Sequence, residues 1–104
     1  MHEFLDLKGA SGAFYRFRHW PEGAAHLPIA GNYVLVQEAA SGFKVLAVGA
    51  SMNLAMARPA ALGRGRRKPV HVYTRLNVSR QLRTSEHEDL VAHYKPAEVL
   101  AETV

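Results

Sequence analysis

The chain has 104 residues, which suits one domain, since a core-forming unit typically has roughly 100 to 150. Its 48% hydrophobic and 21% charged residues exclude the composition of a disordered protein, and its lack of cysteine excludes disulfides, thiolate zinc sites and cysteine nucleophiles. No apolar run approaches the roughly 18 residues that span a bilayer, and no secretion signal is visible at the N-terminus. We therefore expect residues 1–104 to form a single cytoplasmic domain without a membrane partner.

The net charge of +4 is unevenly distributed along the chain. No Asp or Glu occurs between Ala39 and Ser85, whereas nine of the 13 Lys and Arg residues lie there. A long segment with charges of one sign favours a phosphate backbone or an acidic protein surface as partner. The alternative is a loop whose arginines only keep the protein in solution.

The first predicted element is a strand over Phe14–Trp20, entered through the glycine-containing turn at residues 9–12. Aromatic and basic residues alternate in it, so Phe14, Arg16, Arg18 and Trp20 should share one face. We expect an edge strand. The basic and aromatic residues could stack nucleic-acid bases, or they could pack in a core with solvated basic tips.

Two apolar runs at residues 30–37 and 43–49, joined by a short glycine-containing turn, predict a β-hairpin. Residues 51–58 predict a short helix with Ser51 as its N-cap, which Pro59 ends or kinks. A basic loop follows at residues 63–69, then a strand at residues 70–73.

The last long helix should begin at a cap formed by Asn77 or Ser79 and run to about Tyr94, with a short tail helix over residues 97–101. Strand, hairpin, helix, strand and helix in this order predict an α/β (α+β) domain. We expect a small sheet of three to four mostly antiparallel strands, flanked by two or three helices.

Several short motifs, in this order, resemble the GIY-YIG nuclease family. Residues 31–33 (GNY) open one hairpin strand, residues 47–49 (AVG) close the next, and a helix is expected just after that glycine. Residues 88–96 (EDLVAHYKP) resemble the last helix of the family. The GASGAF segment at residues 9–14 and the His-Val pair at residues 71–72 are most similar to small stand-alone bacterial members. The resemblance covers about residues 7–99 and implies a GIY-YIG-like fold.

The same resemblance implies that the family's catalytic site is degenerate here. Cleavage in the family uses a tyrosine near the attacking water, a second tyrosine and an arginine on the phosphate, a metal-binding glutamate and an asparagine. Only the first is matched, by Tyr33, and the others fall on Ala47, Ala57, His87 and Val99. Phosphodiester cleavage needs an activated water, a Lewis acid and positive charge, so these losses argue against the family's mechanism.

A rebuilt site is an alternative on the last helix, where Arg83, Glu86 and His87 share the face that Leu90 continues. One interpretation is an ion pair between Glu86 and Arg83 beside a packed, hydrogen-bonded His87. The other is the remnant of a phosphate or metal site, in which Glu86 and His87, with His71 as a further ligand, hold a divalent ion.

The leading hypothesis is a non-catalytic domain that binds the phosphate backbone of DNA or RNA through a basic surface. The residues expected to contact phosphates are Arg58, Arg64, Arg66, Arg67, Lys68, Arg75 and Arg80, with Arg83 beside them.

Two alternatives belong to other functional classes. One is a divergent endonuclease dependent on Mg²⁺ or Mn²⁺, with Tyr33, Arg83, Glu86 and His87 as its catalytic residues. The other is a scaffold that binds an acidic protein, or a second copy of itself, through the edges of its sheet. Only the endonuclease would need a cofactor, namely the metal ion.

Overall fold

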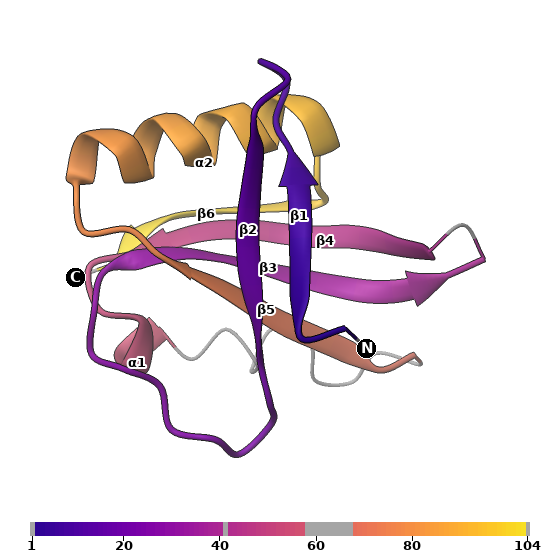
Figure 1. Cartoon of the computed structure of the whole chain (residues 1–104), viewed down its shortest axis with the longest axis horizontal. Helices are drawn as coiled ribbons and strands as arrows, with labels where there is room; N and C mark the ends of the chain where they lie inside the picture. The colour runs from indigo at the N-terminus through magenta and orange to yellow at the C-terminus, as the bar shows by residue number, and fades with distance from the viewer. Residues whose placement is uncertain (1, 41, 58–67, 104) are drawn as a thin grey trace.

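In a computed structural model, which describes residues 2–40, 42–57 and 68–103, the chain forms one six-stranded sheet and two helices (Figure 1). The strands are β1 (Phe4–Lys8), β2 (Phe14–Trp20), β3 (Gly31–Ala39), β4 (Gly42–Ser51), β5 (Val70–Leu76) and β6 (Glu98–Thr103). The helices are α1 (Leu54–Ala57) and α2 (Arg80–Tyr94). Within these described ranges, no helix has the length and apolarity needed to cross a membrane.

The sheet has the strand order β1-β2-β5-β3-β4-β6, in which only β4 and β6 pair in parallel. It curls into a half-barrel, so that β1 and β2 cross the direction of β3, β4 and β5 (Figure 1). The expected GIY-YIG-like sheet of three to four strands with two or three flanking helices is therefore wrong. The sequence motifs are local, whereas the number and order of strands depend on pairings between distant segments.

The strand predicted over Phe14–Trp20 is confirmed as β2, with the same bounds. Its alternation is also confirmed, because Phe17 is buried while Arg16 and Arg18 are exposed. It is not an edge strand, since β1 pairs with one of its edges and β5 with the other. The short β1, with Leu5 and Leu7 as its buried residues, was missed because five alternating residues are a weak signal.

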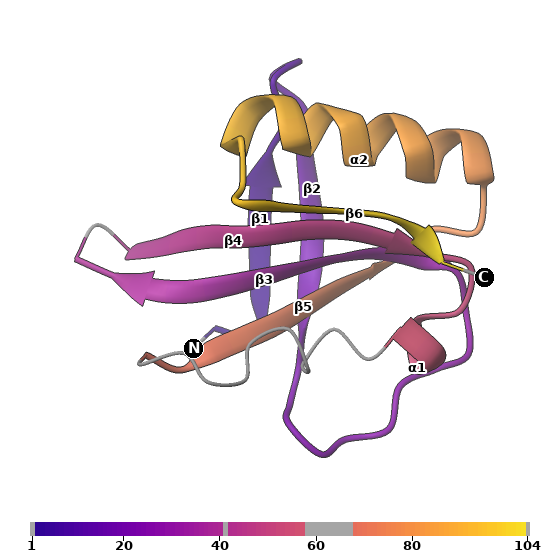
Figure 2. The same cartoon turned by 180° about the vertical axis from the view of Figure 1, so that it is seen from behind.

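The tail helix expected over residues 97–101 is wrong, since residues 98–101 lie in the strand β6. Here β6 runs parallel to β4, with Ala47 opposite Glu98 and Gly49 opposite Leu100. Figure 2 shows β6 beside β4 and below α2. Alanine, glutamate and leucine favour helices on their own, so the open edge of β4 overrides the local preference.

Both helices have caps that explain where they begin. The Ser79 hydroxyl accepts a hydrogen bond from the Leu82 backbone N–H at 3.3 Å, which confirms Ser79 as the N-cap of α2. At α1, the Asn53 side chain accepts from the Ala55 N–H at 3.1 Å, so Asn53 rather than Ser51 has the capping role. Ser51 is instead the last residue of β4.

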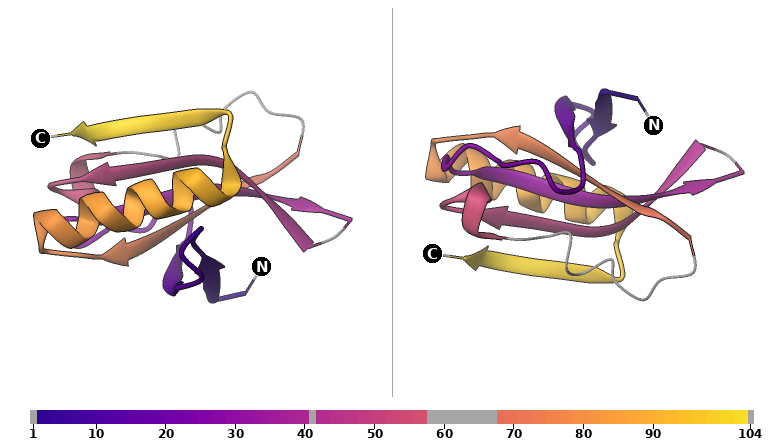
Figure 3. Two further views of the ribbon diagram at one scale, coloured as in Figure 1. Left: turned by 90° about the horizontal axis from the view of Figure 1, so that it is seen from above. Right: turned by 90° about the horizontal axis from the view of Figure 1, so that it is seen from below.

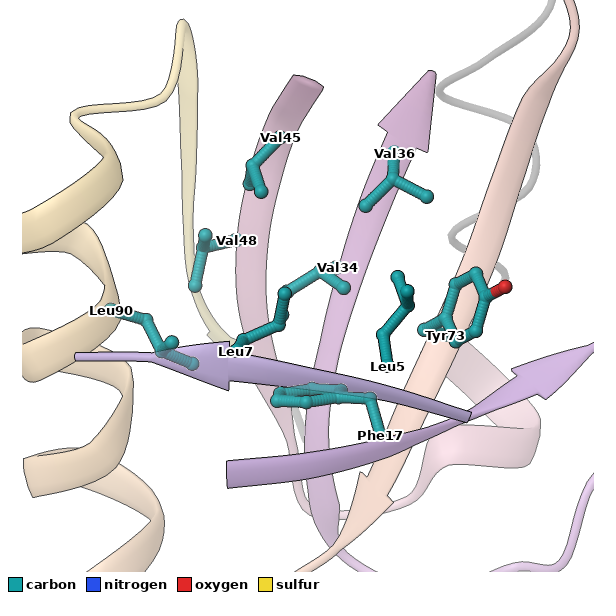
Figure 4. Close-up of a cluster of buried hydrophobic side chains, with 9 residues drawn as sticks. All are labelled: Leu5, Leu7, Phe17, Val34, Val36, Val45, Val48, Tyr73 and Leu90. Atoms are coloured by element: carbon teal, nitrogen blue, oxygen red, sulfur yellow. The ribbon is translucent and has the colours of Figure 1, made fainter. Parts of the chain in front are cut away.

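The two faces of the sheet are covered differently. The concave face, called the inner face, carries α2, and the opposite outer face carries α1 (Figure 3). Figure 4 shows the inner core, to which β1 to β5 and α2 all contribute: Leu5, Leu7, Phe17, Val34, Val36, Val45, Val48, Tyr73 and Leu90. The outer cluster consists of Tyr33, Leu35, Leu46, Ala47, Leu54 and Val72.

A bulge in β4 lets two consecutive residues face outward. The pairing of β3 with β4 skips one residue after Leu35, since Leu35 lies opposite Ala47 and Val36 lies opposite Val45. Leu46 and Ala47 therefore both join the outer cluster. Such a bulge increases the local twist of the sheet, which agrees with its curl.

Candidate functional site

Four polar side chains meet on the inner face, and we call Asn32, Arg75, Asn77 and Glu86 the inner polar cluster. Asn77 Nδ2 donates to Asn32 Oδ1 at 3.0 Å and to Glu86 Oε1 at 3.1 Å. Arg75 Nε donates to the same Glu86 oxygen at 2.8 Å, and the Glu86 side chain is only 12% exposed. Glu86 therefore forms its ion pair with Arg75 of β5. The pair of Glu86 with Arg83, expected from their helical spacing, is not the one that the structure shows. Because its members satisfy one another, the cluster fixes α2 on the sheet.

Arg83 is in contact with Asn32 and Asn77 of this cluster and is 3% exposed. Its NH1 group donates to the backbone carbonyls of Asn77 and Val78, both at 3.0 Å. Its own carbonyl accepts from Asn32 Nδ2 at 3.0 Å. Buried in these contacts, the guanidinium links α2 to the segment before it, which is a poor position for meeting an external phosphate.

His87 is half-buried between α2 and β4. Burial lowers the pKa of its imidazole, while a hydrogen bond to the backbone of Gly49 partly opposes this effect. Its Nδ1 atom is buried and meets no hydrogen-bond partner among the residues the structure describes. The fold therefore favours the neutral form of the His87 imidazole over the charged form.

Tyr33 lies in the outer cluster, on the face of the sheet opposite the inner polar cluster. Its ring rests against Gly49, where a side chain would overlap it. Burial raises the pKa of the Tyr33 hydroxyl above its ordinary value. The structure thus joins Arg83 and Glu86 through Asn77, but the sheet separates Tyr33 from them.

The surroundings of Glu86 disfavour the divalent ion that the sequence suggested there. Glu86 already accepts from Arg75 and Asn77, and the adjacent guanidinium repels a cation. In the described ranges, no group of three or more His, Asp or Glu side chains is arranged to hold a metal ion. His71 lies instead near His19 on β2, with ring centroids 5.7 Å apart.

The basic residues predicted to contact phosphates are in different situations. Arg58, Arg64, Arg66 and Arg67 lie outside the described residues. Lys68 and Arg80 are exposed. Arg75 is committed to Glu86 within the inner polar cluster. The basic surface predicted from the sequence therefore stays a prediction.

A different group of basic and aromatic side chains covers the outer surface of β1 and β2. We call Phe4, Phe14, Arg16 and Arg18 the hairpin face. Phe14 is 66% exposed and Phe4 43% exposed, although both are large apolar residues. The guanidinium carbons of Arg16 and Arg18 lie 5.3 Å and 5.9 Å from the centroid of the Phe4 ring.

Both arginines of the hairpin face also meet a carboxylate. Arg16 Nε lies 2.9 Å from Asp6, and Arg18 NH2 lies 3.2 Å from Glu3. The Arg16 guanidinium lowers the pKa of the Asp6 carboxyl. All four side chains are about half exposed or more, so these ion pairs are weak and leave guanidinium N–H groups facing water.

The outer surface is hollowed where β2 ends and the following loop returns. The hollow, called the Trp20 hollow, has a volume of about 480 Å³. Its lining includes Arg18, Trp20, His26, Leu27, Thr74 and Leu76. A second hollow of about 410 Å³ adjoins it, and the two share His19, Trp20, Pro21 and Ala24.

Hydrogen bonds hold the Trp20 hollow in shape. Trp20 Nε1 donates to the Ala24 carbonyl at 2.7 Å, and the rings of Trp20 and His26 meet edge to face at 4.6 Å. His26 Nδ1 lies 2.9 Å from the Leu27 carbonyl, so it carries the proton and donates. His26 Nε2 lies 2.8 Å from Thr74 Oγ1.

Sequence reasoning missed most of this outer surface. The alternation in β2 did place Arg16, Arg18 and Trp20 on one face, which was the available signal. Nothing in the sequence showed that Phe4 would join them, because that depends on the unpredicted pairing of β1 with β2. The approach of His26 to Thr74, across 48 positions of sequence, likewise has no local signal.

Comparison with protein-family models, with curated proteins and with solved structures finds no match for this chain. The resemblance to the GIY-YIG family and the cytoplasmic location therefore stay predictions.

Proposed function

We propose that the protein binds single-stranded nucleic acid through the hairpin face. One observation carries this proposal: Phe4 and Phe14 expose large aromatic surface on the same side of β1 and β2 as Arg16 and Arg18. Bases stack on exposed aromatic rings with about 1–3 kcal/mol per base, and neighbouring guanidinium groups attract the phosphates between them.

The cross-strand register arranges these residues as an alternating surface. Phe4 lies opposite Arg18, Asp6 opposite Arg16, and Lys8 opposite Phe14. Paired residues point to the same side of a sheet, so each exposed ring has a basic neighbour on the other strand. A paired duplex hides its base faces, whereas a single strand offers them, which is why we propose a single-stranded ligand.

Electrostatics supports the same proposal. The net charge is +4. Asp6 and Glu3 neutralise the two arginines of the hairpin face only through exposed ion pairs. Solvent screens such exposed pairs, so a phosphate can replace the carboxylate at the guanidinium. The arginines at positions 64, 66 and 67, expected from the sequence to meet phosphates, lie outside the described residues and do not carry the proposal.

Binding of a fluorescently labelled thymidine oligonucleotide, about 12 nucleotides long, tests the proposal by anisotropy over a range of salt concentrations. We expect affinity to fall as salt rises. Replacing Arg16 and Arg18 together with alanine should make the slope of log K against log salt shallower by about 1.4, because each lost single-strand phosphate contact removes about 0.7.

Two further variants separate stacking from charge. Phe14→Ala should weaken binding about 5- to 150-fold, which corresponds to the stacking of one base. Leu82→Ala is the matched control, since Leu82 is an exposed apolar residue on α2, away from the hairpin face. Absence of binding at low salt, or equal effects of Phe14→Ala and Leu82→Ala, would refute the proposal. The endonuclease and the scaffold stay alternatives without a supporting observation.

A further inference from the structure

We propose that the Trp20 hollow receives one unstacked nucleobase of the bound strand, with the base against the indole of Trp20 and the adjoining phosphate at Arg18. This inference rests on the proposed function and adds to it a specific site for one nucleotide.

The size and chemistry of the hollow suit such a ligand. Ligand sites typically measure about 300–1,000 Å³ and combine apolar walls with a few polar groups, and this hollow measures about 480 Å³. Trp20 supplies a flat aromatic wall. Leu27 and Leu76 leave much of their apolar surface in water at the same hollow, and a planar base would cover it.

The aromatic wall is held in place before any ligand arrives. The indole N–H is fixed on the Ala24 carbonyl, and His26 supports the ring edge to face. His26 in turn is fixed at both ring nitrogens, by the Leu27 carbonyl and by Thr74. A wall whose orientation is already set loses little conformational entropy on binding, which favours affinity.

Arg18 connects the hollow to the hairpin face. It belongs to the hairpin face and also lines the hollow, and it lies opposite Phe4 on one side and Thr74 on the other. The row from β1 through β2 to β5 spans two strand spacings, about 10 Å. A strand stacked on Phe4 can therefore continue past the Arg18 guanidinium and place a following base in the hollow.

Arg18 favours a nucleotide over a neutral aromatic group as the occupant, and the phosphate would compete with Glu3, which pairs with Arg18 and also lines the hollow. The Arg18 side chain is 69% exposed, and within the described part of the chain its one hydrogen-bonded carboxylate is Glu3. Its remaining N–H groups suit a phosphate. His26 and Thr74 satisfy each other, so few polar groups are left to read a base edge, and we expect little preference between bases.

The only tryptophan of the chain lies in this hollow, so its fluorescence reports the site directly. We expect the thymidine oligonucleotide to quench Trp20 emission with the same midpoint that anisotropy gives for total binding. Thymidine monophosphate should quench the emission at higher concentration. Quenching of equal strength by phenylalanine amide, which has an aromatic ring but no phosphate, would overturn the assignment to a nucleotide.

Two kinds of variant test the contribution of the hollow to affinity. Trp20→Ala should weaken oligonucleotide binding about 5- to 150-fold, whereas Trp20→Phe, which keeps a stacking surface, should change it less than about 5-fold. Leu27→Glu places a negative charge at an exposed position of the hollow, without disturbing the core, and should also weaken binding.

The outcomes distinguish this inference from the proposed function. If the oligonucleotide binds and Phe14→Ala weakens it, but Trp20 emission and the Leu27→Glu affinity stay unchanged, the hollow is not a nucleotide site while the hairpin face still binds. If no oligonucleotide binds at low salt, both proposals fail.

Discussion

The phenol ring of Tyr33 lies directly over Gly49, its partner on the neighbouring strand. A Cβ atom at position 49 would overlap the ring, and the ring fills the space that the missing side chain leaves. An aromatic residue that covers a glycine across two strands stabilises the sheet at a point where it would otherwise be open.

Gly49→Ala should destabilise the protein by about 1–3 kcal/mol, because the added methyl group forces the Tyr33 ring to move within a packed cluster. Urea denaturation measures the loss. In a Tyr33→Leu background the same substitution should cost less, since the overlapping ring is absent. An equal cost in both backgrounds would show that the overlap is not the cause.

Glu86→Ala should destabilise the protein by about 1–3 kcal/mol, because Arg75 and Asn77 lose their shared acceptor in a partly buried place. Glu86→Gln should cost less, since its amide oxygen can still accept. Glu88→Ala on the exposed side of α2 is the matched control and should lie within about 0.5 kcal/mol of the unmodified protein. Thermal or urea denaturation would contradict this account if the Glu86 and Glu88 variants behaved alike.

The stability of the protein should fall as the pH drops below about 6.5, the ordinary pKa of histidine. The pKa of His87 is lowered from 6.5 by burial, so the unfolded chain binds the proton more readily than the folded one. The loss therefore begins as the pH falls through the unfolded value and levels off below the folded value.

His87→Leu should reduce this pH dependence. We assign the remaining part to His19, because burial lowers the pKa of this histidine as well. Urea midpoints at several pH values measure the effect. An unchanged pH dependence in His87→Leu would remove His87 from this explanation.

A second pH effect should appear in acid and depend on Asp89. This carboxylate accepts hydrogen bonds from the Ser11 N–H at 2.8 Å, the Ser11 hydroxyl at 2.6 Å and the Tyr15 hydroxyl at 2.6 Å. Those bonds lower the pKa of Asp89 below 3.8, so its stabilising effect is present above that value and is lost as the pH falls through the lower, folded value.

Asp89→Asn should therefore flatten the acid end of the stability curve and loosen the turn at residues 9–12. Limited proteolysis of that turn measures the loosening, and Glu88→Gln controls for the removal of one carboxylate from α2. A turn that is cleaved at the same rate in both variants would show that Asp89 does not hold it.

The sequence predicted those parts of the fold that depend on neighbouring residues. The alternation of β2, the hairpin of β3 and β4, and the Ser79 cap of α2 are all local, and the structure confirms them. The edge strands β1 and β6 and the position of β5 depend on which distant segments pair. No periodicity within one segment contains that information.

The candidate site shows the same division. Strand alternation indicates that Asn32 and Tyr33 point to opposite faces, but it cannot say which face receives α2. Only the fold reveals that Asn32 meets Asn77 and Glu86, while Tyr33 faces away from them. The Trp20 hollow depends on a loop returning to β5, which composition does not indicate.

The place of β5 has a consequence for how the chain folds. Two hairpins, β1–β2 and β3–β4, are continuous in sequence and can form early, but they touch in the sheet only through β5, which is made after both. Entry of β5 between them is a non-local step, which is the slow kind. Until it occurs, β2 and β3 each leave a strand edge unpaired, so a nascent chain is most exposed to aggregation just before β5 is synthesised.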